Sequence, residues 1–298
     1  MLIFPVISTD DTGMPVRVHP AADRHQENFK CGRYGEMMKF RPVKISSAGW
    51  RVAVCAAAAG LSALQPGTGA GAAEGRMLLM GHLKEPSKHF YASDGYSNGP
   101  NFGVFWKGDH VEFAADAMAL RLDTEGCGGS SCGGKSYASG EYVSVERYGY
   151  GRFEGRIKAA KGAGLVTSLF LYSGPNPDGS NDEIDIEILG KDPTKVTLNY
   201  YTDGETGHSK VVNLGFDASK GYHTYAFEWT AARITWFVDG KKIHSEDGRR
   251  GRLPSHPGYL IANLWAGAGS SARNWTGTFV YPGRPVKAYY DWIRYSPL

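Results

Sequence analysis

The chain has 298 residues, of which 42% are hydrophobic and 21% are charged, with 33 Lys and Arg against 30 Asp and Glu. This composition is that of an ordinary globular protein, and it excludes a disordered polyelectrolyte and a strongly basic nucleic-acid binder. The whole positive excess lies in residues 1–73, so residues 74–298 are formally neutral. A neutral polymer therefore suits the folded part better than DNA, RNA or an anionic membrane, and no apolar run is long enough to span a bilayer.

The amino-terminal segment has the pattern of a secretory signal. Basic residues from Lys39 to Arg51 precede an Ala-rich apolar run over 52–64, and a Gly-rich tail ends in an A-x-A site at 70–72. This order predicts export and cleavage close to Ala72 or Ala73. We therefore expect residues 1–73 to be a non-structural extension plus a signal peptide, with the true translation start at Met37 or Met38, and a secreted protein, either extracellular or periplasmic.

Two cysteines follow the predicted cleavage site. Cys127 and Cys132 stand in the sequence Cys-Gly-Gly-Ser-Ser-Cys, which is flexible enough to close on itself. In an oxidising compartment such a loop is expected to form a local disulfide. No further Cys or His lies nearby at the spacing of a zinc site, so we expect no metal here.

From residue 76 onward the chain alternates short strand patterns with Gly, Asp, Asn and Pro. Examples of the expected strands are 111–113, 119–122, 150–157, 167–172, 183–189, 196–201, 222–229, 234–238, 259–265 and 288–295. Residues 233–244 predict a hairpin that turns at Asp239-Gly240. No window shows sustained helical periodicity. The pattern predicts an all-β protein, an antiparallel two-sheet β-sandwich formed by one domain over 74–298.

The most specific motif is Asn-Asp-Glu-Ile-Asp-Ile-Glu-Ile-Leu-Gly at 181–190, in which acidic and aliphatic residues alternate. A strand places Glu183, Asp185 and Glu187 on one face and the isoleucines on the other. Three like charges in a row repel each other. A merely solvated strand would be expected to carry Lys, Thr or Ser among them, so the pattern favours a function.

Paired carboxyl groups on a rigid surface are what glycosidic bond cleavage requires. A retaining mechanism uses two of them about 5–5.5 Å apart, one as nucleophile and one as acid/base. A third carboxyl group between them, Asp185, could share a proton with Glu183 and raise the pKa of a neighbour that must act as an acid.

This strand resembles the E-x-D-x-E signature of glycoside hydrolase family 16, and further blocks such as Asn263-Leu-Trp265 and Tyr290-Asp-Trp292 extend the resemblance over nearly all of residues 74–298. Within that family the chain resembles the bacterial lichenases (endo-β-1,3-1,4-glucanases) and related exopolysaccharide glycanases. The resemblance implies a concanavalin A-like jelly roll with a concave substrate cleft. It also implies endo-acting hydrolysis of a β-glucan by double displacement, with retention.

The same resemblance implies roles for individual residues. Glu183 would be the nucleophile, Asp185 its assisting carboxylate and Glu187 the general acid/base. Residues expected to contact the sugar chain are Tyr96, Asn98, Glu141, Phe170, Tyr172, Tyr201, Asn263, Trp265 and Trp275. No cofactor is required. Asp291 matches a position that ligates a structural calcium in lichenases, but the other ligands remain unassigned. We expect a monomer whose partner is a polysaccharide.

The sequence departs from the lichenase pattern at two cleft positions. Asn181 stands where lichenases carry a Trp, and Val143 stands where they carry an Arg that contacts sugar. These departures leave the choice of glucan or exopolysaccharide open without touching the three carboxylates.

Two alternative functions use the same fold. A transglycosylase would resolve the glycosyl-enzyme with a sugar hydroxyl, and it would reveal itself by products longer than the substrate. A non-catalytic, lectin-like binding module would have no need for both Glu183 and Glu187. Release of reducing ends from β-glucans separates an enzyme from such a module.

Overall fold

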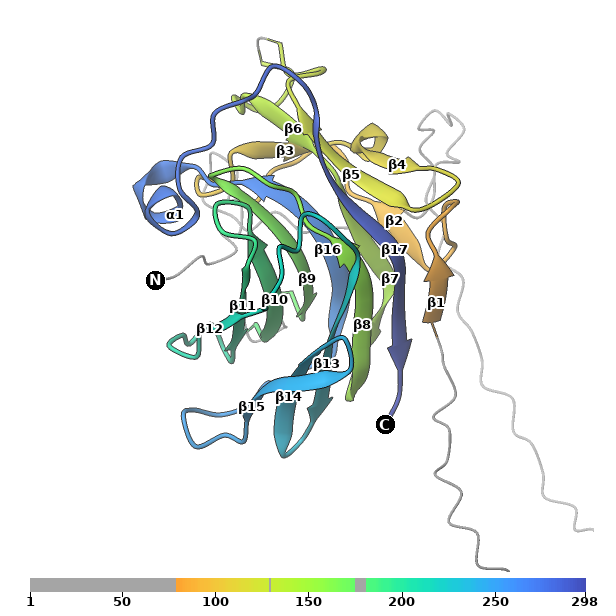
Figure 1. The fold of residues 1–298 in the computed structure, drawn as a ribbon, viewed down its shortest axis with the longest axis vertical. Coiled ribbons are helices and arrows are strands. Elements are labelled where there is room, and N and C mark those ends of the chain that lie inside the picture. Colours follow the sequence, from red (N-terminus) through yellow and green to blue (C-terminus); the bar gives the residue numbers. More distant parts are fainter. Residues whose placement is uncertain (1–78, 129, 175–180) are drawn as a thin grey trace, which may run out of the picture. The chain divides into compact units, whose positions relative to one another are not determined.

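The computed structural model describes residues 79–128, 130–174 and 181–298, which form two packed β-sheets (Figure 1). The predicted signal peptide, the cleavage site and the extension before them lie outside the described residues. In the part that is described, no helix is long and apolar enough to cross a membrane.

One sheet has ten strands in the order β15-β14-β13-β8-β17-β5-β6-β3, with β1 beside β17 and β4 beside β5. All of its pairs are antiparallel except β3 with β6. The strands are β1 (Leu79–His82), β3 (Val104–Trp106), β4 (Val111–Phe113), β5 (Met118–Asp123), β6 (Tyr137–Ser139), β8 (Gly151–Lys158), β13 (His223–Thr230), β14 (Arg233–Val238), β15 (Lys241–Glu246) and β17 (Val286–Ser296).

The second sheet has seven strands in the order β12-β11-β10-β9-β16-β7-β2, all antiparallel. Its strands are β2 (Phe90–Ala92), β7 (Glu141–Tyr148), β9 (Leu165–Tyr172), β10 (Glu183–Leu189), β11 (Lys195–Tyr201), β12 (Lys210–Asn213) and β16 (Gly258–Ala266). The predicted acidic strand is β10, and it lies inside this sheet between β9 and β11. The two-sheet architecture confirms the predicted fold class.

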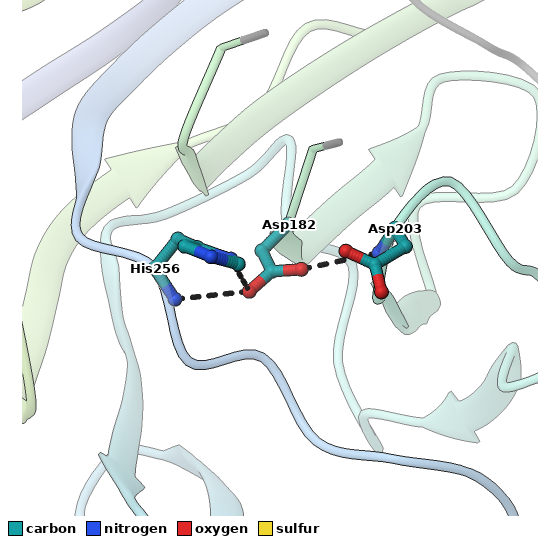
Figure 2. A group of neighbouring side chains, drawn as sticks. All are labelled: Asp182, Asp203 and His256. Carbon is teal, nitrogen blue, oxygen red and sulfur yellow. Dashed lines mark hydrogen bonds and ion pairs between the residues drawn. The ribbon is translucent and has the colours of Figure 1, made fainter. Parts of the chain in front are cut away.

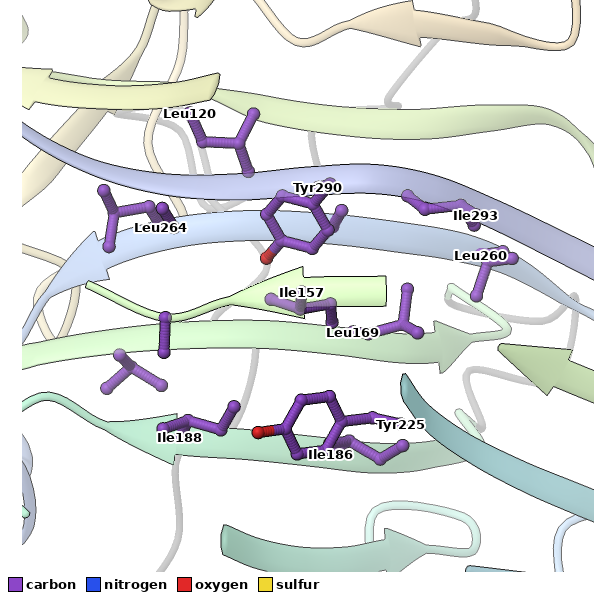
Figure 3. Close-up of a cluster of buried hydrophobic side chains, with 14 of the residues drawn as sticks. Leu120, Ile157, Leu169, Ile186, Ile188, Tyr225, Leu260, Leu264, Tyr290 and Ile293 are labelled. Carbon is purple, nitrogen blue, oxygen red and sulfur yellow. The ribbon is translucent and has the colours of Figure 1, made fainter. Parts of the chain in front are cut away.

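The core lies between the two sheets, as Figure 3 shows. Ile184, Ile186 and Ile188 are each at most 2% exposed, and they pack in one cluster with Ile157 and Tyr225 of the opposite sheet. Because side chains alternate along a strand, the three carboxylates between these isoleucines must project from the outer face of the seven-stranded sheet. We call this outer face the carboxylate face.

Hydrogen bonds from the ten-stranded sheet reach the backbone beneath the carboxylate face. The buried Trp236 indole donates Nε1–H to the main-chain oxygen of Asp185 at 3.1 Å. The Tyr290 hydroxyl donates to the main-chain oxygen of Ser168 at 2.7 Å, and the oxygen of Asn263 lies 3.2 Å away. The ten-stranded sheet thus holds the backbone of three neighbouring strands of the seven-stranded sheet, β9, β10 and β16, in position.

Two local predictions are confirmed. The hairpin of β14 and β15 turns at Asp239 and Gly240, whose φ angles of 48° and 75° are the left-handed values that a tight hairpin turn needs. Cys127 and Cys132 form a disulfide, with their Cα atoms 5.0 Å apart.

The structure also contains helical turns that the sequence analysis did not predict. They are η1 (Gly108–His110) and α1 (Gly269–Thr276). Only Ala272 and Thr276 of α1 are buried, so this short helix has no apolar stripe that a periodicity search could detect.

Candidate active site

Strand register places the three carboxylates of β10 in three parallel rows of side chains. Directly opposite residues of antiparallel strands project from the same face. Glu183 lies opposite Tyr201 on β11 and Tyr172 on β9. The sequence analysis expected both tyrosines to contact the sugar chain, and the structure brings them to either side of the expected nucleophile.

The other two rows are built in the same way. Asp185 lies between Asn199 and Phe170. Glu187 lies opposite Ser168, and this row continues across β16 and β7 through Asn263 and Glu141. These three rows therefore bring five of the predicted contact residues onto one face with the carboxylates, although they come from four different strands.

Burial sets the protonation of the two outer glutamates. Burial, and then the charge of Glu187, raises the pKa of Glu183 to about 8, whereas a hydrogen bond with Asp185 acts to lower it. Burial, and then the charge of Asp185, raises the pKa of Glu187 well above its ordinary value. This shift favours the protonated form of Glu187, the form that a general acid needs.

Asp185 shares a hydrogen bond with Glu183, and the two carboxyl groups respond to it in opposite directions. Burial raises the pKa of Asp185, and both the charge of Glu183 and the shared hydrogen bond raise it further. The bond lowers the pKa of Glu183. When the pair loses its first proton, Asp185 is therefore the group that keeps the shared proton, and the negative charge falls on Glu183, where a nucleophile needs it.

A second buried carboxyl group lies at the other side of the sheet. Glu141 is 2% exposed and accepts hydrogen bonds from the Ser93 hydroxyl at 2.8 Å, the Tyr96 hydroxyl at 2.9 Å and the Asn263 amide at 3.1 Å. Burial raises the pKa of Glu141, and the three donors lower it in part. Three residues predicted to contact the sugar chain, Tyr96, Glu141 and Asn263, thus form one hydrogen-bonded group.

The remaining predicted contacts are used by other parts of the protein. The Asn98 side-chain oxygen accepts a hydrogen bond from Trp106 at 3.0 Å. Trp265 is 2% exposed, with its ring 4.4 Å from that of Phe102 and 6.1 Å from that of Trp275. By register Trp265 also belongs to the carboxylate face, opposite Val166 on β9, but it is covered there, and the half-buried Trp275 is the more accessible ring of the pair.

Asp182, immediately before Glu183, is a structural anchor that the sequence analysis missed (Figure 2). Its buried carboxylate accepts hydrogen bonds from the backbone of Asp203 at 3.2 Å and of Ser255 at 2.6 Å. It also accepts from the backbone of His256 at 2.9 Å and from its imidazole at 3.0 Å. These donors lie 21 to 74 residues away in the chain, so no local sequence signal could have revealed them.

The carboxylate and imidazole groups of Asp182, Asp203 and His256 lie close enough together to resemble a metal site. The Asp182 carboxylate is already saturated by four N–H donors, and Asp203 is paired with Arg252. This group therefore fits a hydrogen-bonded anchor for the start of β10 rather than a cation site.

Asp291 was the expected calcium ligand. Its carboxylate accepts a hydrogen bond from Arg156 at 3.0 Å, and its main-chain oxygen accepts one from Leu83 at 3.0 Å. With a guanidinium beside the carboxylate, these contacts do not fit a calcium site.

Two half-buried glutamates on one face of a strand, with a buried aspartate between them, fit the pair of carboxyl groups that a glycoside hydrolase requires. Comparison with known proteins agrees. The family model described as "Glycosyl hydrolases family 16" matches residues 98–294. The chain belongs to this family.

Individual relatives support the same family assignment. The chain is 43% identical over 217 residues to the beta-glucanase of Paenibacillus polymyxa, an alignment that covers 71% of this chain and 86% of the relative. It is 44% identical over 206 residues to the beta-glucanase of Bacillus subtilis, covering 68% and 79%. The structure of Bacillus licheniformis beta-glucanase superposes with a TM-score of 0.67 at 40% identity and covers 74% of this chain and 98% of that one.

Proposed function

We propose that this protein is an exported, endo-acting β-glucanase that hydrolyses a β-1,3-1,4-glucan or a related β-linked exopolysaccharide with retention of configuration. The observation that carries the proposal is the placement of Glu183 and Glu187 on one face of β10, with Asp185 between them. Relatives that are named beta-glucanases support the substrate class.

The first step is formation of a glycosyl-enzyme. Glu187, which burial keeps protonated, donates its proton to the glycosidic oxygen as the bond breaks. In the reactive form the pair of Glu183 and Asp185 has lost one proton, and Glu183, which then carries the negative charge, attacks the anomeric carbon. The leaving sugar departs with the proton of Glu187.

The second step releases the product. Glu187, now ionised, takes a proton from a water molecule, and the oxygen of that water attacks the anomeric carbon and displaces Glu183. Two inversions at the same carbon give net retention. Tyr172 and Tyr201 flank Glu183 in its row, where their rings can lie against the apolar faces of the sugar.

The test is release of reducing ends from a panel of β-1,3-1,4-glucan, β-1,3-glucan, β-1,4-glucan and bacterial exopolysaccharides, with viscosity followed in parallel. An endo-acting enzyme lowers viscosity early, while few reducing ends have formed. Glu183→Gln should abolish both signals. Absence of reducing ends from every polymer would contradict hydrolysis, and products longer than the starting oligosaccharide would establish the transglycosylase alternative.

A further inference from the structure

The row of side chains that contains Glu183 continues across the sheet to a cation. Tyr172 on β9 lies opposite Tyr259 on β16, and Tyr259 lies opposite Arg147 on β7. Arg147 therefore belongs to the carboxylate face. It lies three strands from Glu183, about 14 Å at a spacing of roughly 4.8 Å per strand. A polysaccharide that crosses the strands at Glu183 would pass over Tyr172 and Tyr259 before it reaches Arg147.

Arg147 is held in place by stacking and has an accessible charge. Its guanidinium carbon lies 4.9 Å from the centre of the Tyr259 ring, a cation–π contact that orients a planar group without neutralising it. The side chain is exposed, and no carboxylate of the described residues lies within 4.0 Å of it. Lys195, on the same face at β11, differs because it is paired with Asp192 at 2.8 Å.

The surroundings of Arg147 suit a sugar that carries a negative charge. Tyr91 on β2 lies opposite Val143 on β7 and so belongs to the same face; burial, then the charge of Glu141 and that of Tyr259, raises its pKa to about 12. Tyr91, Tyr172 and Tyr259 thus provide aromatic surface near the guanidinium. The buried carboxyl groups at the centre of the face would repel an anionic substituent there, whereas Arg147 would attract one at a distance from them.

We propose that Arg147 is a specificity-determining residue that binds a carboxylate substituent of the polysaccharide, with Tyr259 as its support. The preferred substrate is then an acidic β-linked exopolysaccharide instead of a neutral glucan, a refinement that rests on the proposed β-glucanase function. The neutral balance of residues 74–298 does not oppose this proposal, because recognition depends on one local cation and not on the net charge. A guanidinium also suits the task because it can bind a carboxylate through two parallel hydrogen bonds.

The test compares two polymers that differ only in charge. One is β-1,3-1,4-glucan partly oxidised at C6 to uronate, and the other is the same preparation after methyl esterification of those carboxylates. The wild type should have a higher kcat/KM on the uronate than on the ester. Arg147→Gln should lower this preference by about fivefold, the upper range for an exposed ion pair, and Arg147→Lys should keep part of it. Raising the ionic strength should weaken the preference of the wild type.

Arg233 provides the matched control, because it is an exposed arginine on β14 of the opposite sheet. Arg233→Gln removes the same charge and should leave the preference at the wild-type value. The proposal is overturned if the wild type does not prefer the uronate, or if Arg147→Gln lowers kcat/KM equally on both polymers, which would indicate a structural or hydroxyl-binding role.

A binding measurement separates this proposal from the proposed reaction. In a Glu183→Gln background no turnover is needed, and retardation in gels containing either polymer reports affinity alone. Uronate-specific retardation that is lost in the Arg147→Gln double variant supports the role of Arg147 even if the wild type hydrolyses no polymer. If both polymers retard the Glu183→Gln single variant, which keeps Arg147, to the same extent, the role of Arg147 is refuted.

Discussion

The carboxyl groups of Glu183, Asp185 and Glu187 compete for protons because burial disfavours charge on each of them and their charges repel. Asp185 acts on both neighbours in this competition. While it is protonated, its hydrogen bond to Glu183 favours the nucleophilic anion, and once it ionises at higher pH, its charge helps to keep the proton on Glu187. One side chain thus prepares both partners for opposite roles.

Asp185→Asn should move the alkaline limb of the pH profile. Because the charge of Asp185 raises the pKa of Glu187, a neutral amide lets Glu187 lose its proton at lower pH. The alkaline limb of kcat/KM on β-glucan should shift to lower pH by about one unit. The measurement is initial rate against pH at low substrate concentration. An alkaline limb that does not move, or that moves to higher pH, would show that Asp185 does not control the acid.

Glu183→Gln should stabilise the protein in a pH-dependent way. The pKa of Glu183 rises from 4.5 to about 8 in the folded state, so its stabilising effect is complete below pH 4.5 and is lost as the pH rises through 8. The side-chain amide of the Glu183→Gln variant does not ionise, so the variant does not lose this stability as the pH rises. The variant should therefore unfold at nearly the wild-type temperature at pH 4. At pH 7 it should be more stable by up to about 3 kcal/mol.

Thermal unfolding at both pH values tests this prediction. A stabilisation of equal size at pH 4 and pH 7 would mean that packing, and not the ionisation of Glu183, is responsible.

Strand β10 is held from two directions. Its start is fixed by Asp182, whose carboxylate gathers backbone donors from distant segments, and its backbone is fixed from below by Trp236. The neighbouring strands β9 and β16 are fixed by the Tyr290 hydroxyl. Side chains of the carboxylate face are thus placed by hydrogen bonds to the backbone of their own strands.

Tyr290→Phe should measure what one of these supports contributes. The variant keeps the ring but leaves the main-chain oxygens of Ser168 and Asn263 without this donor. The free energy of unfolding should fall by about 1–2 kcal/mol, seen as a lower melting temperature. Tyr289→Phe, at the adjacent half-buried position, should change it by less than about 0.5 kcal/mol. Equal effects of the two variants would contradict the role of the buried hydroxyl.

The sequence predicts an element well where its signal is local and repeated. The span of β10 is predicted at both ends because acidic and aliphatic residues alternate without a break. Strand β7, which carries Glu141 and Arg147, is not among the strands that the sequence analysis names. Its pairing with β16 is irregular, since Val143 and Arg147 are four residues apart but lie opposite Ile261 and Tyr259, which are two apart. No spacing rule for a regular strand reproduces that register.

The distinction between local and long-range signals also applies to the site. The carboxylates of β10 are predictable because one strand carries all three. The group of Ser93, Tyr96, Glu141 and Asn263 is not, since its hydrogen bonds join residues up to 122 apart. The resemblance to a known family identified three of these four residues, whereas periodicity alone identified none of them.

At the scale of the whole molecule, export remains a prediction from the sequence, and the Cys127–Cys132 disulfide is consistent with it. Protein recovered from the culture medium or periplasm should begin near Ala73 or Glu74. Terminal sequencing gives the cleavage site, and intact mass with and without reduction should show that both cysteines are oxidised to each other. A chain that begins at Met1 in those fractions, or two free thiols in freshly exported protein, would contradict the prediction.

The central claim is the division of labour between Glu183 and Glu187, and the anomeric configuration of azide adducts tests it most directly. In Glu183→Ala, azide can occupy the space left by the nucleophile and attack an activated aryl β-glycoside from the opposite face, which gives the α-glycosyl azide. In Glu187→Ala the glycosyl-enzyme still forms, because this leaving group needs no proton. Azide then resolves the glycosyl-enzyme to the β-glycosyl azide. Proton NMR should show the α-adduct from the first variant and the β-adduct from the second. The opposite pairing would reverse the two roles, and turnover near the wild-type rate on polysaccharide by either variant would contradict the catalytic role of that residue.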